Sequence, residues 1–331
     1  MRIAIVKLSA IGDIVHTMVV LQFIKQEFPH FIIDWFVDDS LKGIIENNPD
    51  INEIRVIKLR EAKKKKSLVL IFNEISKLRK IKKYDIVIDI QNLIKSAIIA
   101  RLIPSDKTIG LDKNSSRESI ASIFYSEKYS VKHSTNVISR NISIINKALK
   151  MQIVNDDVKR KSPFLFFNDI SFPDLISKTK PNILLIPGAS FESKMYPAEK
   201  YAQLSKKINA NFIVLWGNPV ERKIAQQIKI LTPTVSLTSQ LSIDNLKALI
   251  SVVDLVIGSD TGPVHMAWGL NIASITLFGP TPGYRNSFVT NINQIIESNS
   301  KVNPYKINRN DFSIKDIRVD EVVKVANKLL I

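Results

Sequence analysis

Short apolar runs that alternate with helical patterns constrain the fold of this 331-residue chain more than any other feature. Runs rich in Val, Ile and Leu are typical of buried strands, and amphipathic segments with the helical period follow most of them. Strands that alternate with helices at this spacing predict a parallel, doubly wound α/β sheet. The expected strands are residues 2–7, 31–37, 53–57, 85–90, 108–111, 182–186, 211–216, 235–237, 252–258 and 273–277.

A stretch punctuated by proline interrupts this alternation once. Pro163, Pro173 and Pro181 lie within residues 152–181, where no sustained period is visible. We interpret this stretch as the region between two domains. The sequence therefore predicts two doubly wound, Rossmann-like halves with a cleft between them and ligands beyond the carboxyl ends of the strands. We place the domains at residues 1–165 and 166–315, with 316–331 as a terminal helix that could pack back toward the first domain.

The charge of the chain is its one unusual bulk property. Its 47 Lys and Arg against 31 Asp and Glu give a formal net charge of +16, which favours anionic partners or reflects a lysine-rich, solvated surface. No nucleic-acid-binding motif is visible, so we expect no nucleic-acid partner. The absence of cysteine excludes disulfides and thiolate chemistry and favours a cytoplasmic protein. The first residues read as a strand and not as a signal peptide.

Residues 259–265, SDTGPVH, end one apolar run and open a helical pattern. In α/β proteins such a turn presents free backbone N–H groups and the positive end of the helix dipole, which suits an anion. Gly262 allows close approach of a ligand, and His265 adds a side-chain donor. The plainer interpretation is an Asp260 that caps the helix and a histidine that packs.

The first strand-to-helix loop carries Gly12 and Asp13 but lacks the glycine pattern of dinucleotide-binding folds. Asp13 could be a general base that takes a proton from an attacking hydroxyl. It could equally be the N-cap of the following helix. His16, one turn further on, is expected to be structural or to contact a substrate.

Three loops of the second half carry polar residues at the ends of successive predicted strands. Ser190 and Lys194 follow the first strand, Trp216 and Glu221 the second, and the turn at residues 259–265 a later one. Individually each has a plain explanation, such as a solvated lysine or a glutamate in a first helical turn. Together a cation, a carboxylate and a helix N-terminus predict a site for a nucleoside diphosphate.

These segments resemble the lipopolysaccharide heptosyltransferases, a family of ADP-heptose-dependent glycosyltransferases with the GT-B fold. The resemblance covers nearly the whole chain. It lies in KLSAIGDIVHT at residues 7–17 and in SDTGPVH at 259–265, followed by FGPT at 278–281. DIQNLIKS at residues 89–96, and RE at 117–118 with ASIFY at 121–125, resemble the type I branch in particular.

The resemblance implies a role for each matching residue. Asp13 would be the catalytic base, and Asp260 would contact the heptose. Ala189 and Ser190 stand where the type I enzymes have two threonines, so one hydroxyl contact is missing. Ser190, Lys194, Thr261, Gly262 and His265 would hold the pyrophosphate, Glu221 and Leu241 would lie near the nucleoside, and Gly12, Arg60, Lys63, Lys64 and Arg117 would face the acceptor.

The implied activity is an inverting transfer of L-glycero-D-manno-heptose from ADP-heptose to the Kdo of phosphorylated Kdo–lipid A. No cofactor besides the donor and no metal is expected, because the sequence has no Asp-x-Asp motif or histidine cluster. The enzyme would work as a peripheral protein on the anionic inner face of the cytoplasmic membrane. The alternatives are a type II enzyme that adds a later heptose, a sugar-nucleotide epimerase of the same fold, and a non-catalytic anion-binding protein.

Overall fold

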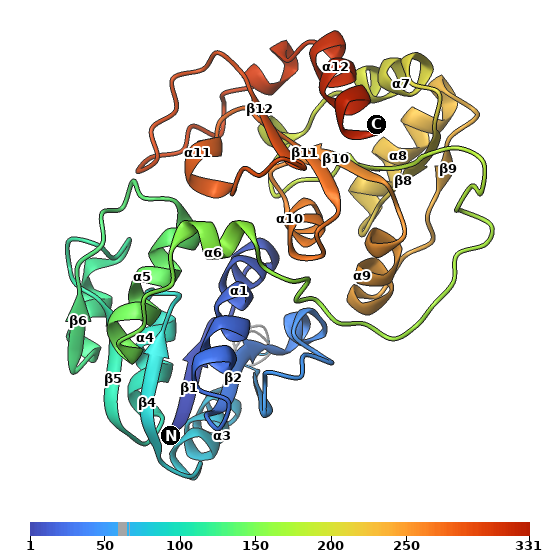
Figure 1. Cartoon of the computed structure of the whole chain (residues 1–331). Helices are drawn as coiled ribbons and strands as arrows, with labels where there is room; N and C mark the ends of the chain where they lie inside the picture. The colour runs from blue at the N-terminus through green and yellow to red at the C-terminus, as the bar shows by residue number, and fades with distance from the viewer. Residues whose placement is uncertain (59–64, 66) are drawn as a thin grey trace. The chain divides into compact units, whose positions relative to one another are not determined.

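The computed structural model describes residues 1–58, 65 and 67–331 (Figure 1). The chain forms two compact units, Met1–Phe166 and Phe167–Ile331. Sequence analysis placed the boundary one residue earlier, after residue 165. Three residues implied in acceptor binding, Arg60, Lys63 and Lys64, lie outside the described residues.

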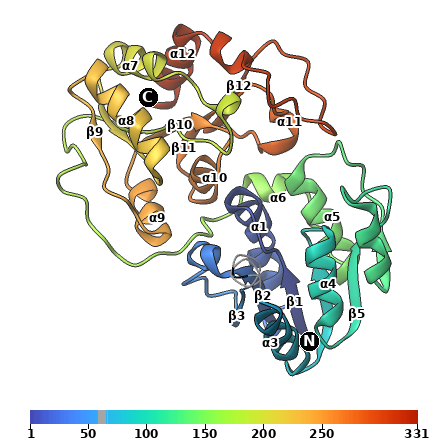
Figure 2. The same ribbon diagram turned by 180° about the vertical axis from the view of Figure 1, so that it is seen from behind.

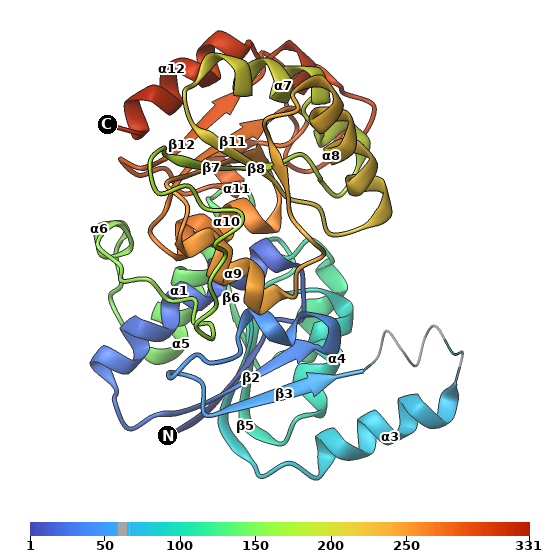
Figure 3. The same ribbon diagram turned by 90° about the vertical axis from the view of Figure 1, so that its right-hand side faces the viewer.

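The first unit is built on a parallel sheet, as the alternating pattern predicts. Its described strands follow the order β3-β2-β1-β4-β5-β6. Figure 3 shows α1 and α5 on one side of this sheet and α3 and α4 on the other. The strands are β1 (Arg2–Val6), β2 (Ile32–Asp38), β3 (Glu53–Ile57), β4 (Tyr84–Asp89), β5 (Ser105–Leu111) and β6 (Glu127–Tyr129). The helices are α1 (Ile11–Glu27), η1 (Asp39–Ile44), α3 (Leu68–Arg79), α4 (Ile94–Leu102), η2 (Ser119–Phe124), α5 (Val137–Leu149) and α6 (Asn155–Lys159).

The second unit repeats the same plan. Its described strands follow the order β12-β11-β10-β7-β8-β9, again in parallel. The strands are β7 (Asn182–Ile186), β8 (Asn211–Val214), β9 (Ser236–Leu237), β10 (Leu255–Ser259), β11 (Ala273–Phe278) and β12 (Asn293–Glu297). The helices are η3 (Glu192–Lys194), α7 (Ala198–Lys207), α8 (Pro219–Leu231), α9 (Ile243–Ser251), α10 (Gly262–Gly269), α11 (Gly283–Asn286), η4 (Ser313–Asp316) and α12 (Val319–Leu329).

The terminal helix α12 belongs to the second unit, whereas the sequence analysis set residues 316–331 apart from the second domain. Val319, Val322 and Ala326 are buried on one face of α12 and join the hydrophobic core of the second unit. Figures 1 and 2 both show α12 beside α7, with which it is in contact. The spacing of these apolar residues by three and four positions gives α12 a stripe that the second unit covers.

Sequence analysis missed the outer strands β6 and β12. The described β6 is only three residues long, and none of them is fully buried. The sequence of β12, NQIIE, has polar residues at both ends, so its apolar run is too short to stand out. The weak hydrophobic patterns of β6 and β12 are the reason that these two strands escaped detection, whereas the other edge strands, β3 and β9, were predicted.

The strand orders show one switch point in each sheet. On one side of it successive strands are added toward one edge, and on the other side toward the opposite edge. In the first unit this point lies between β1 and β4, and in the second between β7 and β10. Open α/β sheets bind ligands beyond the carboxyl ends of the strands at such a switch point. A glycine allows close packing there in the second unit: a Cβ at Gly258 would lie 2.8 Å from Ile186 Cβ and 2.9 Å from Val264 Cγ2. The first turn of α10 can therefore lie close to β7.

In the described parts of the chain, each helix is too short or too polar to span a bilayer.

Candidate active site

A buried carboxylate, Asp260, organises the switch point of the second unit. It lies between β10 and α10, with 8% of its surface exposed. Its Oδ2 accepts hydrogen bonds from Lys194 Nζ at 2.8 Å, Thr281 Oγ1 at 3.0 Å and Asn286 Nδ2 at 3.3 Å. Its Oδ1 lies 3.0 Å from Nε2 of His265. Since an ionised carboxylate only accepts hydrogen bonds, Nε2 of His265 must carry the proton in this contact.

The partners of Asp260 come from three different connections. Lys194 ends η3 in the connection from β7 to α7, His265 lies in the first turns of α10, and Thr281 and Asn286 follow β11. Burial alone would raise the pKa of Asp260, but the Lys194 charge and the His265 hydrogen bond hold it well below its ordinary value. Asp260 is therefore a permanent anion at neutral pH, and it fixes the position of the buried Lys194 ammonium.

The N-terminus of α10 lies beside this cluster. Thr261 is the N-cap residue, and its side chain makes no capping hydrogen bond. The first N–H groups of a helix have no intrahelical acceptor, and the helix dipole makes this end attractive to anions. Thr261 and Gly262 are both partly exposed. The second unit thus brings a lysine, a histidine and a helix N-terminus together at one end of its sheet, as the sequence predicts.

Glu221 has a local partner that the sequence did not reveal. Its Oε2 accepts a hydrogen bond from the Gly217 N–H at 2.7 Å. Its carboxyl group also fills the space beside Gly188, where an added Cβ would lie 2.5 Å from Glu221 Cδ. Glu221 therefore links the connections that follow β7 and β8. Asn218 is the residue that caps α8, because its Oδ1 accepts from the N–H groups of Val220 and Glu221.

The remaining residues assigned to the donor lie on nearby connections of the same unit. Ser190 is exposed in the connection after β7, and Leu241 is partly exposed just before α9. The indole N–H of Trp216 donates to the Thr238 carbonyl at 2.6 Å, so this ring is tied to the connection after β9. The hydrogen bonds of Asp260 described above involve neither Ser190 nor Leu241.

Asp13 lies in the first turn of α1 in the first unit. The N-cap residue of α1 is Ala10, so the interpretation of Asp13 as the N-cap was wrong. Asp13 stands three residues later, and its Oδ2 accepts the Ala10 N–H at 3.2 Å. Sequence reasoning misplaced the start of α1 because the helix begins at Ile11, within the loop expected to precede it. The side chain of Asp13 is half-buried, whereas His16 is buried.

The acceptor residues are only partly described. Gly12 lies beside Asp13 in the first turn of α1, and Arg117 has an exposed side chain in the segment before η2. Two residues of the Asp260 cluster were missed as candidates, Thr281 and Asn286. Thr281 belongs to the FGPT segment that the resemblance singled out, which was the available signal for it. Asn286 had no sequence signal.

Among the described residues, no three His, Asp or Glu side chains cluster as metal ligands would.

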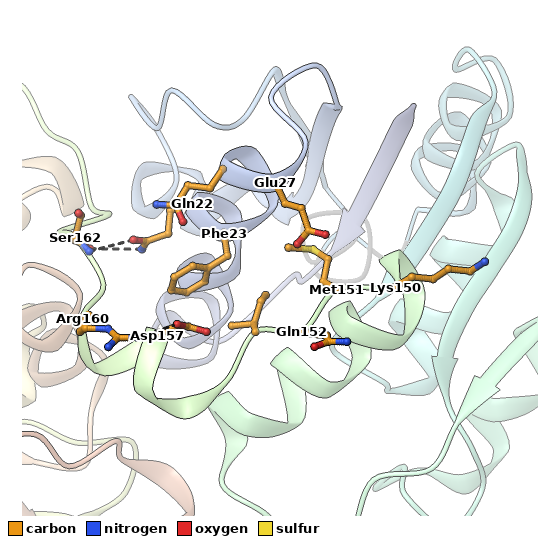
Figure 4. A pocket seen from close by; sticks show the side chains of 11 residues that line it. Gln22, Phe23, Glu27, Lys150, Met151, Gln152, Asp157, Arg160 and Ser162 are labelled. Atoms are coloured by element: carbon orange, nitrogen blue, oxygen red, sulfur yellow. Dashed lines mark hydrogen bonds and ion pairs between the residues drawn. The ribbon is translucent and has the colours of Figure 1, made fainter.

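A cavity of about 710 Å³ in the first unit is lined by residues from the later part of α1 and from the segment that follows α5 (Figure 4). Gln22 lies nine positions after Asp13, roughly 14 Å along a helix. The rim carries an ion pair of Asp157 and Arg160, 3.3 Å apart, and hydrogen bonds between Gln22 and Ser162. Asp157, Arg160, Gln22 and Ser162 thus already have partners within the rim. The lining residues are Gln22, Phe23, Gln26, Glu27, Lys150, Met151, Gln152, Ile153, Asp157, Arg160 and Ser162.

Known proteins resemble this chain over almost its full length. Residues 74–311 match the model of glycosyltransferase family 9 (heptosyltransferase). The chain is 36% identical to lipopolysaccharide heptosyltransferase 1 of Campylobacter coli, with 99% of both chains covered. It is 26% identical to the protein of the same name from Pseudomonas aeruginosa, with 87% of this chain and 81% of that one covered.

Two solved structures share the two-sheet fold. The E. coli heptosyltransferase WaaC with ADP superposes with a TM-score of 0.80 at 21% identity, over 99% of this chain and 100% of that one. The family 9 glycosyl transferase from Veillonella parvula superposes with a TM-score of 0.82 at 18% identity, over 99% and 97%.

The Asp260 cluster predicts a large loss of stability in Asp260→Asn. This change keeps the shape of the side chain but leaves the buried Lys194 ammonium without a counter-charge, which should cost about 3 kcal/mol. Denaturant unfolding at pH 7, followed by a probe in the second unit, measures this loss. Because the pKa of Asp260 is depressed in the folded state, its contribution is present at neutral pH and is lost as pH falls below the ordinary carboxyl value. Asp260→Asn should accordingly flatten the acid limb of the stability profile.

The matched control for this prediction is Asp320→Asn. Asp320 pairs with Lys207 at 2.6 Å, but the two side chains are 62% and 51% exposed. An exposed pair contributes little, so the unfolding midpoint of Asp320→Asn should stay close to that of the parent. Equal effects of the two substitutions would show that Asp260 has no special structural role.

Proposed function

Since the chain belongs to glycosyltransferase family 9, the heptosyltransferases, and is thus a glycosyltransferase, we propose that it is a type I enzyme of lipopolysaccharide inner-core synthesis. It transfers L-glycero-D-manno-heptose from ADP-heptose to the Kdo of phosphorylated Kdo–lipid A. The observation that carries the donor half of this proposal is the Asp260 cluster beside the N-terminus of α10, at the carboxyl ends of β7 and β10. The similarity to heptosyltransferase 1 of Campylobacter coli along 99% of both chains supports type I over type II. Family membership favours transfer over epimerisation or simple anion binding.

The donor diphosphate binds at the N-terminus of α10. An ammonium group has three donors, and Asp260 takes one of those of Lys194, so others can face a phosphate. The amides of Thr261 and Gly262 and the hydroxyl of Ser190 add further donors. Nε2 of His265 is directed at Asp260, so this ring donates to a phosphate through Nδ1 only as the doubly protonated imidazolium. Glu221 and Leu241 lie on the connections assigned to the nucleoside, and a contact of Asp260 with the heptose stays a prediction.

Asp13 of the first unit acts as the base in an inverting displacement. Its Oδ2 is held by the Ala10 N–H, which leaves Oδ1 for the proton of the attacking Kdo hydroxyl. As the bond from the anomeric carbon to ADP breaks, the sugar acquires oxocarbenium character, as in glycoside hydrolysis. Negative charge grows on the departing diphosphate at the same time. Lys194 and the α10 amides are aimed at that charge before the reaction starts, which lowers the barrier.

These protein groups supply the charge stabilisation for which many glycosyltransferases use a metal ion. We therefore expect no cofactor besides the donor substrate. Turnover should be the same with and without EDTA in the assay, and loss of activity on chelation would contradict this expectation.

The first unit has an exposed surface that suits contact with a membrane, as expected if the acceptor is itself a lipid. Val69 and Phe72 lie one turn apart on α3, and they are 68% and 70% exposed. Arg79 and Lys80, at the end of the same helix, are also exposed. A helix that carries an exposed apolar pair and ends in cationic side chains suits the interface of an anionic bilayer. We place the enzyme on the cytoplasmic face of the inner membrane, with α3 in contact with anionic lipid.

Asp13→Asn tests the chemical step. The substitution removes the base but keeps the size of the side chain and leaves the donor site of the second unit untouched. We expect release of ADP from ADP-heptose in the presence of Kdo–lipid A to fall by at least about 100-fold. ADP affinity, measured by calorimetry, should be unchanged. Parental turnover in Asp13→Asn would refute the role of this residue, and release of ADP that does not require Kdo–lipid A would refute the acceptor.

Lys194→Ala tests the donor site. Loss of the ammonium removes a charge-assisted contact with the diphosphate, so ADP should bind roughly 10-fold or more weakly by calorimetry. The control is Lys207→Ala, which removes an exposed lysine of the same unit that pairs with Asp320. Its ADP affinity should match that of the parent. Unaltered affinity in a folded Lys194→Ala protein would contradict the assignment.

The membrane proposal predicts that Val69→Ser with Phe72→Ser weakens binding to vesicles that contain phosphatidylglycerol. Burial of these two side chains at an interface should account for roughly a 10-fold change in partitioning, measured by co-sedimentation. Ile230→Ser is the control, because Ile230 is 77% exposed on α8 of the second unit. Equal binding of the double variant and the parent, or no preference for anionic over phosphatidylcholine vesicles, would exclude α3 as the docking element.

A further inference from the structure

The side chain of Gln91 connects the two central strands of the first unit. Gln91 follows β4, and its Oε1 accepts hydrogen bonds from the N–H groups of Leu8 at 2.7 Å and Ser9 at 3.1 Å, in the connection after β1. Its Nε2 donates to Ser9 Oγ at 3.3 Å. One amide side chain thus satisfies three polar groups of the connection that leads to Asp13. Sequence analysis noted Gln91 only as part of a resembling segment and gave it no role.

A buried carboxylate fixes Gln91 in turn. The backbone N–H of Gln91 donates to Oδ1 of Asp89 at 2.9 Å, and the N–H of Asn92 donates to the same atom at 3.0 Å. Oδ2 of Asp89 accepts from Ser96 Oγ at 2.8 Å and from the Tyr125 hydroxyl at 2.7 Å. Asp89 has no exposed surface. A buried carboxylate with this many donors has one stable arrangement. The backbone from which the Gln91 side chain projects is therefore held in place.

The held connection leads directly to Asp13. Ser9 precedes Ala10, whose N–H donates to Asp13 Oδ2. On the other side of the connection, the Asp38 N–H donates to the Leu8 carbonyl at 3.2 Å. The backbone that presents the Ala10 N–H is therefore fixed from β2 and from β4. Without Gln91, two backbone N–H groups would lose their acceptor, and the connection could shift toward other partners.

We propose that Gln91 is a positioning residue for the transfer reaction: its side-chain amide sets the connection after β1 and so the place of the Asp13 carboxylate. This inference rests on the proposed role of Asp13 as the base. Gln91 itself does not touch the substrates in this assignment. Its effect should fall on the chemical step, because a displacement of about 1 Å in a reacting group can cost about 100-fold in rate.

The first test compares three substitutions that separate the acceptor oxygen of Gln91 from its size. Gln91→Met keeps the length of the side chain but removes the acceptor, and Gln91→Asn keeps the amide but is one methylene too short. Both should lower kcat by about 10- to 100-fold. Gln91→Glu retains an oxygen for both N–H groups, and the Ser9 hydroxyl can turn to donate to it, so kcat should stay within about 3-fold of the parent. KM for ADP-heptose and ADP affinity should be unchanged in all three.

A loss that follows from weaker folding would look different. Thermal unfolding of each variant shows whether the protein is folded at the assay temperature, and should Gln91→Met unfold, the milder Gln91→Asn carries the comparison. Parental kcat in a folded Gln91→Asn or Gln91→Met protein would overturn the proposal. A fall in ADP affinity equal to the fall in kcat would also overturn it, because a positioning role for Asp13 leaves the donor site intact.

The second test is a double-mutant cycle with Asp13→Asn, followed in single turnovers at high enzyme concentration. If Gln91 acts through Asp13, adding Gln91→Met to Asp13→Asn should lower the rate by less than about 3-fold, since no base is left to misplace. If the rate loss of the double variant equals the product of the two single losses, the positioning role is overturned. Parental turnover in Asp13→Asn alone would instead refute the proposed base, so the two failures are distinguishable.

Discussion

The ion pair of Lys194 and Asp260 is the interaction on which the second unit's site depends. Both side chains are about nine-tenths buried, so neither charge is stable there without the other. Asp260 accepts from Thr281 and Asn286 as well and lies against His265, and it thereby ties the connections after β7, β10 and β11 to one point. A charge cluster of this kind contributes less to net stability than apolar packing would. Its value lies in a fixed direction for the Lys194 ammonium and for the first turn of α10.

The first unit uses the same arrangement with different chemistry. At its switch point, the Gln91 side chain from the connection after β4 reaches the connection after β1. In the second unit, Lys194 from the connection after β7 reaches Asp260 after β10. In both sheets, a side chain from the connection after one central strand holds the connection after the neighbouring central strand, at the point where the strand order reverses. At a switch point the connections of the two neighbouring strands lead away in opposite directions and leave a crevice. The side-chain contacts across this crevice therefore set its shape.

Sequence reasoning recovered the parts of this structure that repeat locally. Central strands such as β7 and β10 are continuous apolar runs, and the turn at Asp260 ends one of them, so both were visible in the sequence. The residues that complete the cluster were harder to find. Asn286 lies 26 positions after Asp260, and only the folded β11 connection brings it within 3.3 Å. The placement of α12 against α7 was likewise a tertiary outcome, because its apolar stripe specifies that a face is buried but not by which unit.

The N-cap interpretation of Asp13, which was wrong, and the unforeseen partner of Glu221 share a physical cause. Asp13 and Glu221 are acidic residues near a helix start, where a carboxylate can cap the helix, accept an N–H from the preceding loop or point toward a ligand. These choices differ by a rotation of one side chain and by a shift of one or two residues in the helix boundary. The structure resolves them as hydrogen bonds from Ala10 to Asp13 and from Gly217 to Glu221. A sequence pattern has no signal for that rotation.

The Lys194 side chain is already ordered without a ligand. This order affects donor binding and the chemical step differently. In the proposed reaction, a lysine without a partner would lose conformational freedom when the diphosphate binds, and that loss would weaken donor binding. Asp260 has already ordered the Lys194 side chain, so little further ordering is required. The pair is neutral as a whole, so its attraction for an incoming anion is short-ranged and depends on direction. In the proposed transfer, such a site stabilises the leaving diphosphate most as charge moves onto it. Fixed donors then accelerate the reaction and do not merely tighten the ground state.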